Sequence, residues 1–492
     1  MSDVTTWALA AAALVAALPA LLRWLRIAQR EHYIPASVTR FAWRWWTSSP
    51  MNVAILLGAV AGTAGALRDA IWGFAVVAAQ AGPMGLTVMG RTSPVYWTAR
   101  LKRVAALAGV LIVAGLVSGV AMAMPLLIAM TLLGAPAIVD ASLFALRPIE
   151  KRLGTRWVDK ASAKLRAVGP EVVAITGSYG KTTTKGYVAH LVGGSRRTVA
   201  SPASFNNRMG LARAINEHLV PGTEVFIAEM GTYGPGEIAE LCSWIPPKVA
   251  AMVSIGPVHL ERFKTEERIV EAKSEILDGA GLGVICVDHP LLYRLADERA
   301  KSMPIRRVSA ANGAVTVDGD AIADVPDGVF GANLAVAFGI GMALGVDVEE
   351  MKKRIPDLPR PEHRLSTTVS DLGVTIIDDT FNSNPAGARR GLEALRRFGA
   401  EGRRVVVTPG MVELGPLQES ENESWARDAA GVANDIVIVG RTNRRALLRG
   451  AETGDASVTV VESRIEAVDW VRGNLVAGDA VLYENDLPDH YP

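Results

Sequence analysis

The chain has 492 residues, of which 50% are hydrophobic and 21% are charged. This composition excludes extended disorder and collagen-like repeats, and the length predicts two to four domains. A net charge of +1 argues against a nucleic-acid-binding protein, and two distant cysteines argue against a disulfide scaffold or a cysteine-based zinc site.

The first third of the sequence has the pattern of a membrane region. Residues 4–22 are 19 consecutive uncharged residues, enough to cross a bilayer core at ~1.5 Å per residue. Further uncharged stretches cover residues 51–67, 70–90 and 104–139, and the last could form two helices that turn near Met124-Pro125. No basic residue precedes the first stretch, so a signal peptide is not expected. We predict a transmembrane helical region over residues 1–147 with three to five spans.

Basic residues flank these stretches in three clusters, Arg23–Arg44, Arg91–Arg103 and Arg147–Arg152. Five spans with the N-terminus outside would place all three clusters in the cytoplasm, as the positive-inside rule requires. Trp43, Trp45 and Trp46 would then lie at the inner interface. The alternative is that short stretches, residues 51–67 above all, are re-entrant or interfacial helices. We therefore expect a multi-pass protein of the cytoplasmic membrane with its catalytic domains in the cytoplasm.

From about Glu171 the sequence alternates between short apolar runs and helical patterns. The runs of the first series lie at residues 171–176, 224–229, 249–255 and 283–287, and those of the second at 374–378, 403–408, 435–440 and 479–483. Such a series predicts an α/β fold with mostly parallel sheets covered by helices. The proline-rich, charged stretch Arg354–Pro361 predicts an interdomain linker. We place a central domain at residues 148–353 and a C-terminal Rossmann-like α/β domain at residues 354–492.

A glycine-rich loop joins the first run to a helical stretch. Glycines let backbone N–H groups face anionic oxygens, the helix N-terminus adds positive charge, a lysine reaches the phosphates, and a hydroxyl can bind Mg²⁺. Ile175 stands where the general motif has a glycine, and the alternative is a glycine turn with an incidental lysine. We predict that ATP phosphates bind Gly177, Ser178, Tyr179, Gly180, Lys181, Thr182 and Thr183.

This short loop with its threonine run resembles the ATP loop of the Mur ligases, the amide-forming enzymes of peptidoglycan synthesis. Its Gly-Ser start resembles the MurF branch, which adds D-alanyl-D-alanine. The resemblance covers about residues 163–482 and implies a P-loop central domain followed by a Rossmann-like domain. Other segments resemble family motifs in the family order: SFNNRMGL at 204–211, EMG at 229–231, GPVHLERF at 256–263, AKSEI at 272–276, GAN at 331–333, Arg364, DDTFNSNP at 378–385 and GMVELG at 410–415.

The resemblance implies a reaction that uses ATP and Mg²⁺. A carboxylate takes the γ-phosphoryl group, and an amine then attacks the acyl phosphate to give an amide, ADP and phosphate. Such chemistry depends on positioning and charge neutralisation. The implied metal ligands are Thr182, Glu229 and His259, and the implied catalytic residues are Lys181, His259, Lys273, Arg364 and Asp379. The implied ATP contacts outside the loop are Asn333, Arg364 and Asn382, and the implied substrate contacts are Asn206, Asn207 and Asn384.

Each of these residues has an ordinary structural alternative. Glu229 could be a solvated carboxylate at a strand end, and His259 a capping or core histidine. Lys273 could be a surface lysine beside Glu271 and Glu275, although some family members carry a carbamate at this lysine. The asparagines could serve turns or helix caps, and Arg364 could be a solvated linker charge.

The sequence departs from the family at three places. The N-terminal UDP-sugar-binding domain is absent, and the apolar stretches occupy its place. Phe381 replaces the usual tyrosine. The family's Lys-Gly-Ser-Arg near the end is missing, and the chain ends instead in the acidic stretch YENDLPDHYP at residues 483–492. An acidic tail would repel a carboxylate acceptor and suit a cationic or amino group. The alternative is a solvated, frayed terminus.

We therefore expect a membrane-anchored, ATP-dependent ligase with a carboxylate substrate and an amine substrate. The carboxylate could belong to a nucleotide-linked or lipid-linked cell-wall precursor. The alternatives are a ligase for another substrate, such as a polyglutamate-type polymer, and a P-loop ATPase that drives transport. A catalytically inactive subunit is a further alternative. No ABC-type signature such as Leu-Ser-Gly-Gly-Gln supports the transport reading.

Overall fold

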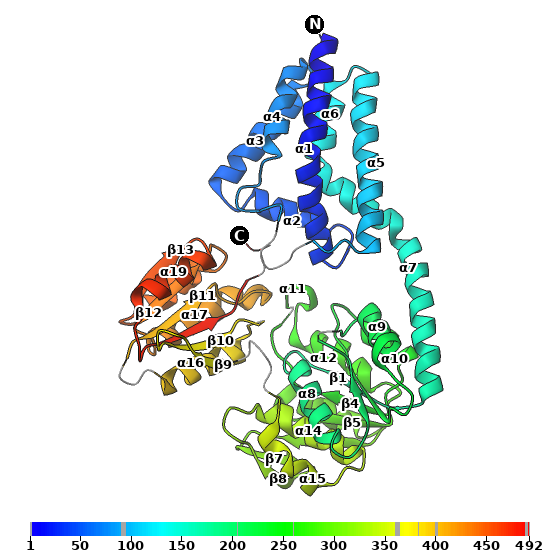
Figure 1. The fold of residues 1–492 in the computed structure, drawn as a ribbon, viewed down its shortest axis with the longest axis vertical. Coiled ribbons are helices and arrows are strands. Elements are labelled where there is room, and N and C mark those ends of the chain that lie inside the picture. The colour runs from blue at the N-terminus through cyan, green and yellow to red at the C-terminus, as the bar shows by residue number, and fades with distance from the viewer. Residues whose placement is uncertain are drawn as a thin grey trace. The chain divides into compact units, whose positions relative to one another are not determined.

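The computed structural model describes residues 2–89, 95–203, 205–258, 260–359, 365–381, 383–398, 402–487 and 491. The chain divides into two compact units, Met1–Leu153 with Leu487–Pro492, and Gly154–Asp486. The first unit is helical, and the second contains two sheets covered by helices (Figure 1). The predicted α/β class with a preceding helical region is therefore confirmed.

The helical unit is built from apolar helices that pack along one another. Helices α1 and α5 lie side by side, and α3 pairs with α4 (Figure 1). Its elements are α1 (Ser2–Arg30), α2 (Ser37–Trp46), α3 (Pro50–Gly65), η1 (Ala70–Trp72), α4 (Gly73–Ala79), α5 (Ala99–Ala121), α6 (Pro125–Leu133) and the first half of α7 (Ala135–Val168).

Within the described residues, two helices are long and apolar enough to cross a membrane, Val4–Arg30 and Ala99–Ala121. A third span results only if α6 and α7, bent by 70°, count as one. This is the lower end of the predicted three to five, and the expected turn near Met124-Pro125 is confirmed. The expectation of one helix over residues 70–90 is wrong: α4 ends at Ala79, and Pro83 and the positive φ of Gly85 are incompatible with a continuing helix.

Polar contacts inside this unit fix the shorter elements. The Arg23 guanidinium donates to the carbonyl oxygens of Gln80 (3.1 Å), Ala81 (3.2 Å) and Leu86 (3.1 Å), beyond the end of α4. The buried Asp140 carboxylate accepts from the Thr39 backbone N–H at 2.7 Å, at the start of α2. On α2, Trp43 is 67% exposed, whereas Trp45 packs into the core rather than facing outward.

The central sheet has eight strands in the order β2-β3-β1-β4-β5-β6-β7-β8, and it is parallel except for β7, which is antiparallel to both β6 and β8. Its strands are β1 (Glu171–Thr176), β2 (Thr198–Ala200), β3 (Val225–Glu229), β4 (Val249–Met252), β5 (Leu282–Cys286), β6 (Ile305–Ser309), β7 (Ala314–Val317) and β8 (Asp320–Asp324). Its helices are α8 (Lys181–Val192), α9 (Arg208–His218), α10 (Glu237–Trp244), α11 (Leu260–Phe263), α12 (Glu266–Ser274), α13 (Pro290–Arg299), α14 (Gly331–Ala343) and α15 (Val348–Lys353).

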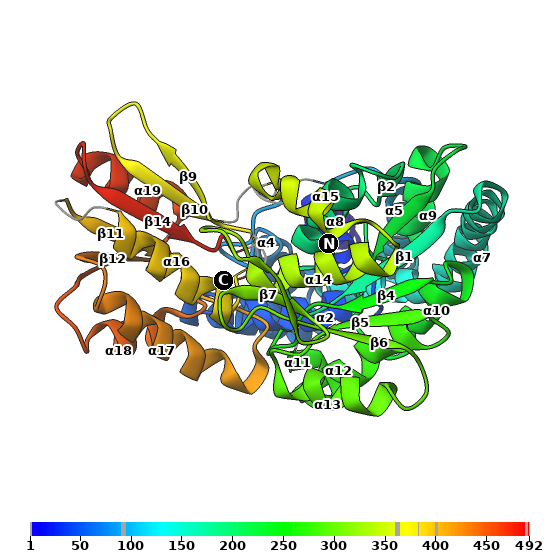
Figure 2. The same ribbon diagram turned by 90° about the horizontal axis from the view of Figure 1, so that it is seen from below.

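Alternate residues of the central strands pack into two separate cores. Val172 and Ala174 of β1 face one core with α9, α10, α12 and α13, and the second half of α7 joins it through Val158 and Leu165. Val173 and Ile175 face the other core with α8 and α14. Figure 2 shows α8 and α14 on one side of the strands and α12 and α13 on the other. The phosphate loop therefore emerges from a strand that is buried on both faces.

The C-terminal part has a six-stranded sheet in the order β13-β12-β11-β14-β10-β9, parallel except for β9. Its strands are β9 (Ser366–Val369), β10 (Thr375–Asp379), β11 (Arg404–Thr408), β12 (Asp435–Val439), β13 (Ser457–Val461) and β14 (Ala480–Glu484). Its helices are α16 (Pro385–Arg397), α17 (Gln418–Ala430), α18 (Arg444–Ala451) and α19 (Arg464–Asn474). The neighbouring strands β10, β14 and β11 are parallel, so their carboxyl ends lie together at the carboxyl edge of this sheet.

Candidate active site

The phosphate loop joins β1 to α8 in the strand–loop–helix arrangement that an anion site needs. Gly180 has φ +76°, and a Cβ there would lie 2.3 Å from Oδ1 of Asn333. Glycine is required here because the backbone has a positive φ that other residues rarely adopt. It is also required because the Asn333 side chain from α14 lies against the loop and leaves no room for a Cβ. The predicted nucleotide residues of the loop and Asn333 are therefore brought together.

The loop that follows β4 packs against the phosphate loop through Ser254 and Gly256. The Ser254 hydroxyl accepts from the Tyr179 backbone N–H at 2.9 Å and donates to the Tyr179 carbonyl at 2.9 Å. The Ser178 N–H donates to the Ser254 carbonyl at 2.8 Å, and the Tyr179 ring lies against Gly256. The Lys181 ammonium donates to the Gly177 carbonyl at 2.7 Å, across its own loop. Sequence reasoning missed Ser254, since nothing local in the sequence marks a serine that packs under another loop.

Thr182 and Glu229 meet directly, as the predicted metal site requires. The Thr182 hydroxyl donates to Glu229 Oε2 at 3.0 Å, and Glu229 is 1% exposed at the end of β3. A hydroxyl and a carboxylate are hard oxygen donors that suit Mg²⁺. Within the described residues, no group of three or more histidine, cysteine or acidic side chains is arranged so that it could hold a metal ion. These two residues thus fit an ion that takes its other ligands from phosphate oxygens and water.

A buried lysine that sequence reasoning missed completes this cluster. Lys185 lies one helical turn after Lys181 and is 5% exposed. Its ammonium contacts Glu229 Oε2 at 3.0 Å and the Ala203 carbonyl at 2.5 Å. The Asn206 amide donates to Glu229 Oε1 at 3.2 Å, so the carboxylate has protein partners on both oxygens. The available signal was the i, i+4 spacing of the two lysines on one face of α8.

Lys273 is buried in α12 with 3% exposure, so the surface alternative is wrong. Burial lowers its pKa well below the usual range, and the Lys181 ammonium lowers it further. Glu275, which was expected beside Lys273 at the surface, caps α10 instead. The Glu275 carboxylate accepts hydrogen bonds from the backbone N–H groups of Gly236 (2.7 Å) and Ala239 (3.0 Å). Burial in the folded protein therefore disfavours the charged form of Lys273.

Two of the predicted substrate residues form helix caps. Asn207 Oδ1 accepts from the Gly210 N–H at 2.9 Å at the start of α9, and Asn384 Oδ1 accepts from the Gly387 N–H at 2.9 Å at the start of α16. A substrate contact of either residue would have to use its amide nitrogen. The predicted site residues His259, Arg364 and Asn382 lie outside the described residues.

The carboxyl edge of the C-terminal sheet carries a buried acid. Glu484 ends β14 and accepts from the Thr408 hydroxyl at 2.5 Å and from the Ser383 hydroxyl. Burial raises the pKa of Glu484 to about 7, and Asp379 nearby raises it as well, against the two hydrogen bonds. Asp486 forms an ion pair with Arg464. The alternative of a solvated, frayed terminus is therefore wrong for these two residues, because Glu484 is buried and Asp486 is paired.

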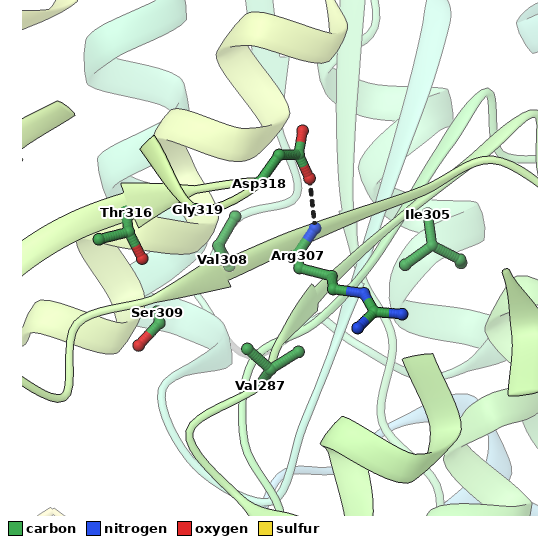
Figure 3. Close-up of a pocket in the computed structure, with 8 residues that line it drawn as sticks. All are labelled: Val287, Ile305, Arg307, Val308, Ser309, Thr316, Asp318 and Gly319. Atoms are coloured by element: carbon green, nitrogen blue, oxygen red, sulfur yellow. Dashed lines mark hydrogen bonds between the residues drawn. The ribbon is translucent and has the colours of Figure 1, made fainter. Parts of the chain in front are cut away.

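A cavity of about 470 Å³ lies elsewhere in the central domain, over β6 and β7. Figure 3 shows Val287, Arg307, Ser309 and Asp318 among its lining residues. The Arg307 backbone N–H donates to Asp318 at 2.8 Å, and the Arg307 guanidinium pairs with Asp297 at 2.6 Å. The charged groups that line this cavity are therefore already paired with other groups of the protein, and none of the lining residues is a predicted site residue.

Two family models match the soluble part. Residues 175–337 match the Mur ligase middle domain, and residues 363–483 match the Mur ligase glutamate ligase domain. The UDP-N-acetylmuramoyl-tripeptide–D-alanyl-D-alanine ligase of Mycobacterium leprae is 30% identical over 373 residues, 65% of this chain and 72% of the relative. The Bacillus subtilis ligase of the same name is 28% identical over 301 residues, 58% of this chain and 63% of that protein.

Solved structures show the same fold. The MurF ligase of Thermotoga maritima in complex with ADP is 25% identical, with a TM-score of 0.55 over 68% of this chain and 80% of that chain. A MurF structure from Acinetobacter baumannii is 23% identical, with a TM-score of 0.58 over 68% of this chain and 78% of that chain.

Proposed function

Because the chain belongs to the Mur ligase family, we propose that it is a membrane-anchored ligase of cell-wall or envelope biosynthesis. Like the family, it is an ATP-dependent enzyme that forms an amide bond with Mg²⁺ as its metal. The observation that carries the site assignment is the contact of Thr182 with Glu229 beside Lys181, with Asn333 against the same loop. The membrane anchor, the site roles and the substrates are the new parts of this proposal.

In the proposed reaction, some residues of the phosphate loop bind the phosphates and others neutralise their charge. Backbone N–H groups of the loop and the start of α8 would bind phosphate oxygens, and the Lys181 ammonium would leave the Gly177 carbonyl for the transferred phosphoryl group. Thr182 and Glu229 would hold the metal. A bound Mg²⁺ would supply positive charge against the negative charge of the phosphates. Burial lowers the pKa of Lys273, and the neutral form of its amine is the form that can react with carbon dioxide to give a carbamate.

The membrane anchor is supported by apolar side chains that face outward. On α1, Val15 is 76% exposed and Leu18 is 62% exposed, and Val110 and Val117 of α5 are comparably open. Such a continuous apolar surface would be costly in water and is typical of helices that contact lipid. On the same unit, α2 presents Arg40 and Arg44 with Trp43, the residue types of a membrane–water interface.

The relatives' names indicate the first substrates to test, UDP-N-acetylmuramoyl-tripeptide and D-alanyl-D-alanine. A different amine is the second candidate, and Glu484 favours it. This buried acid lies beside Asp379 at the carboxyl edge of the C-terminal sheet. An additional carboxylate on the amine substrate would be repelled there, whereas an amine without one would not.

A product assay tests the proposal. The full chain in detergent is given ATP, Mg²⁺, the tripeptide precursor and D-alanyl-D-alanine, and the amide and ADP are quantified together. Equal amounts of both support the D-alanyl-D-alanine reaction. Lys181→Ala should abolish both, whereas Lys164→Met, which removes a lysine–carbonyl bond to Asn216 outside the loop, should not. Product formation by Lys181→Ala would refute the phosphate role.

The substrates and the membrane anchor of the proposed function are tested by separate experiments. If ADP binds but no amide forms with this pair, lipid-linked acids and amines lacking a carboxylate replace them in the same assay. Extraction of cell membranes with alkaline carbonate tests the anchor. Release of the chain into the supernatant would contradict membrane anchoring without affecting the ligase assignment.

A further inference from the structure

Lys185 occupies an unusual position for a lysine, since its charged end is inside the protein. The side chain is 7% exposed, and Glu229, its ion-pair partner, is 2% exposed. A lysine is rarely buried without a defined partner, because removing its charge from water is costly. Here two N–H donors of one ammonium are directed at two different elements, the metal-site carboxylate on β3 and the carbonyl of Ala203.

Ala203 belongs to the segment between β2 and α9 that ends in Asn206 and Asn207. It has φ +40°, an uncommon backbone conformation for a residue other than glycine. Such a conformation persists where surrounding contacts enforce it. The Lys185 ammonium, 2.5 Å from the Ala203 carbonyl, is one such contact.

The same segment is attached to the end of β3 at further points. The Ser201 hydroxyl accepts from the Glu229 backbone N–H at 3.2 Å, and the Gly231 N–H donates to the Asn206 carbonyl at 2.8 Å. The Asn206 amide reaches the free side of the Glu229 carboxylate at 3.2 Å. Lys185 is therefore the charged centre of an assembly that joins α8, β3 and the asparagine segment.

We propose that Lys185 is a positioning residue that orients the Glu229 carboxylate for the metal and fixes the asparagine segment beside the phosphate loop. The proposal rests on the proposed function for the roles of Glu229 and Asn206, but its structural part does not. Thr182 and Lys185 both donate to Oε2, so the carboxylate orientation is determined before any metal arrives. Charge-assisted hydrogen bonds of this kind are about twice as strong as neutral ones.

This role predicts a separation between nucleotide binding and turnover. The phosphate loop keeps its own contacts through Lys181 and Ser254, so Lys185→Met should change the dissociation constant of ADP without Mg²⁺ by less than about threefold. Turnover depends on the carboxylate and the segment together, so kcat should fall about 30-fold with a much smaller change in the KM for ATP.

Hydrogen exchange of the full chain without metal or nucleotide provides a readout that does not depend on activity. Peptides covering residues 201–211 should exchange at least about tenfold faster in Lys185→Met, while peptides from β1 and β4 keep their rates. Lys164→Met is the matched control, because it also removes a lysine–carbonyl bond but leaves this segment alone. Unchanged exchange of residues 201–211 would overturn the proposal.

A conservative variant keeps the test decisive if Lys185→Met does not fold. Lys185→Arg retains the positive charge and the hydrogen-bond donors. The exchange rate of residues 201–211 in this variant should therefore be closer to the wild-type rate than the rate in a folded neutral variant such as Lys185→Gln. A loss of ADP binding together with retained kcat would also overturn the positioning role. If the wild type makes no amide, the proposed function fails, whereas the exchange data still decide the role of Lys185.

Discussion

Replacing Glu484 with glutamine should make the C-terminal sheet more stable at neutral pH. The carboxyl group is fully buried, and burial raises its pKa from the usual 4.5 to about 7. At about 1.36 kcal/mol per tenfold change in proton affinity, this difference corresponds to about 3 kcal/mol. Glutamine has nearly the same shape, and the Ser383 and Thr408 hydroxyls can each donate or accept a hydrogen bond. The variant should therefore remove the cost of a buried charge without creating a cavity.

The size of the stability difference between Glu484→Gln and the wild type depends on pH. Below pH 4.5 the carboxyl is protonated in both the folded and the unfolded chain, so Glu484 and its variant should be equally stable. Between pH 4.5 and 7 the unfolded chain releases the proton while the folded chain retains it, so the wild type loses stability as the pH rises. Above pH 7 the full difference of about 3 kcal/mol should separate Glu484→Gln from the wild type.

Hydrogen exchange of peptides from residues 402–487 measures this difference in the full chain, after correction for the intrinsic exchange rate at each pH. Glu462 is the matched control, because hydrogen bonds from Arg444 and Arg441 lower its pKa. Glu462→Gln should be destabilising above pH 4.5, the opposite sign. Equal protection of wild type and Glu484→Gln at pH 8 would refute the assignment of a costly buried charge.

Three further predictions concern the other charged and polar contacts. Lys273→Met should lower amide formation by at least about 100-fold. It should also raise the melting temperature at pH 7, because burial lowers the Lys273 pKa and the unfolded chain binds the proton more tightly than the folded chain does. A lower melting temperature would contradict this prediction. Thr182→Val should raise the Mg²⁺ concentration for half-maximal ADP formation by about tenfold and leave metal-free ADP binding unchanged. Arg23→Leu should destabilise the helical unit in detergent by about 3 kcal/mol, because several carbonyl acceptors lose their donor; Arg23→Lys should lose less, and equal melting temperatures would refute the capping role.

The sequence predicted the buried strands well and the exposed ones poorly. All eight apolar runs form strands within about two residues of the expected start, because continuous β-branched runs have few other places in a soluble domain. The other six strands, β2, β6, β7, β8, β9 and β13, were missed. None of them is buried along its whole length, and β2, β8, β9 and β13 lie at sheet edges. Their pairing comes from neighbouring strands, which no local pattern records.

The site was predictable where its residues are adjacent in sequence. Residues 177–183 follow one strand and begin one helix, so their geometry is local. Lys185 and Ser254 act through partners 44 and 75 residues away in sequence, and only folding reveals those contacts. The burial of Lys273 was likewise hidden, because a lysine flanked by acids in a helix has the same sequence pattern whether it faces solvent or the core.

The helical unit changes what the ligase must provide for its acid substrate. Residues 1–153 stand where the family has its UDP-binding domain, so affinity for the acid has to come from another source. Two molecules confined to one membrane meet at an effective concentration far above that in solution, which lets weak contacts suffice. A freely diffusing acid gains nothing from such an anchor. If UDP-N-acetylmuramoyl-tripeptide gives no amide, an acid held in the same membrane is therefore the candidate that the proposed anchor favours, with Asn206 close to the metal-site carboxylate.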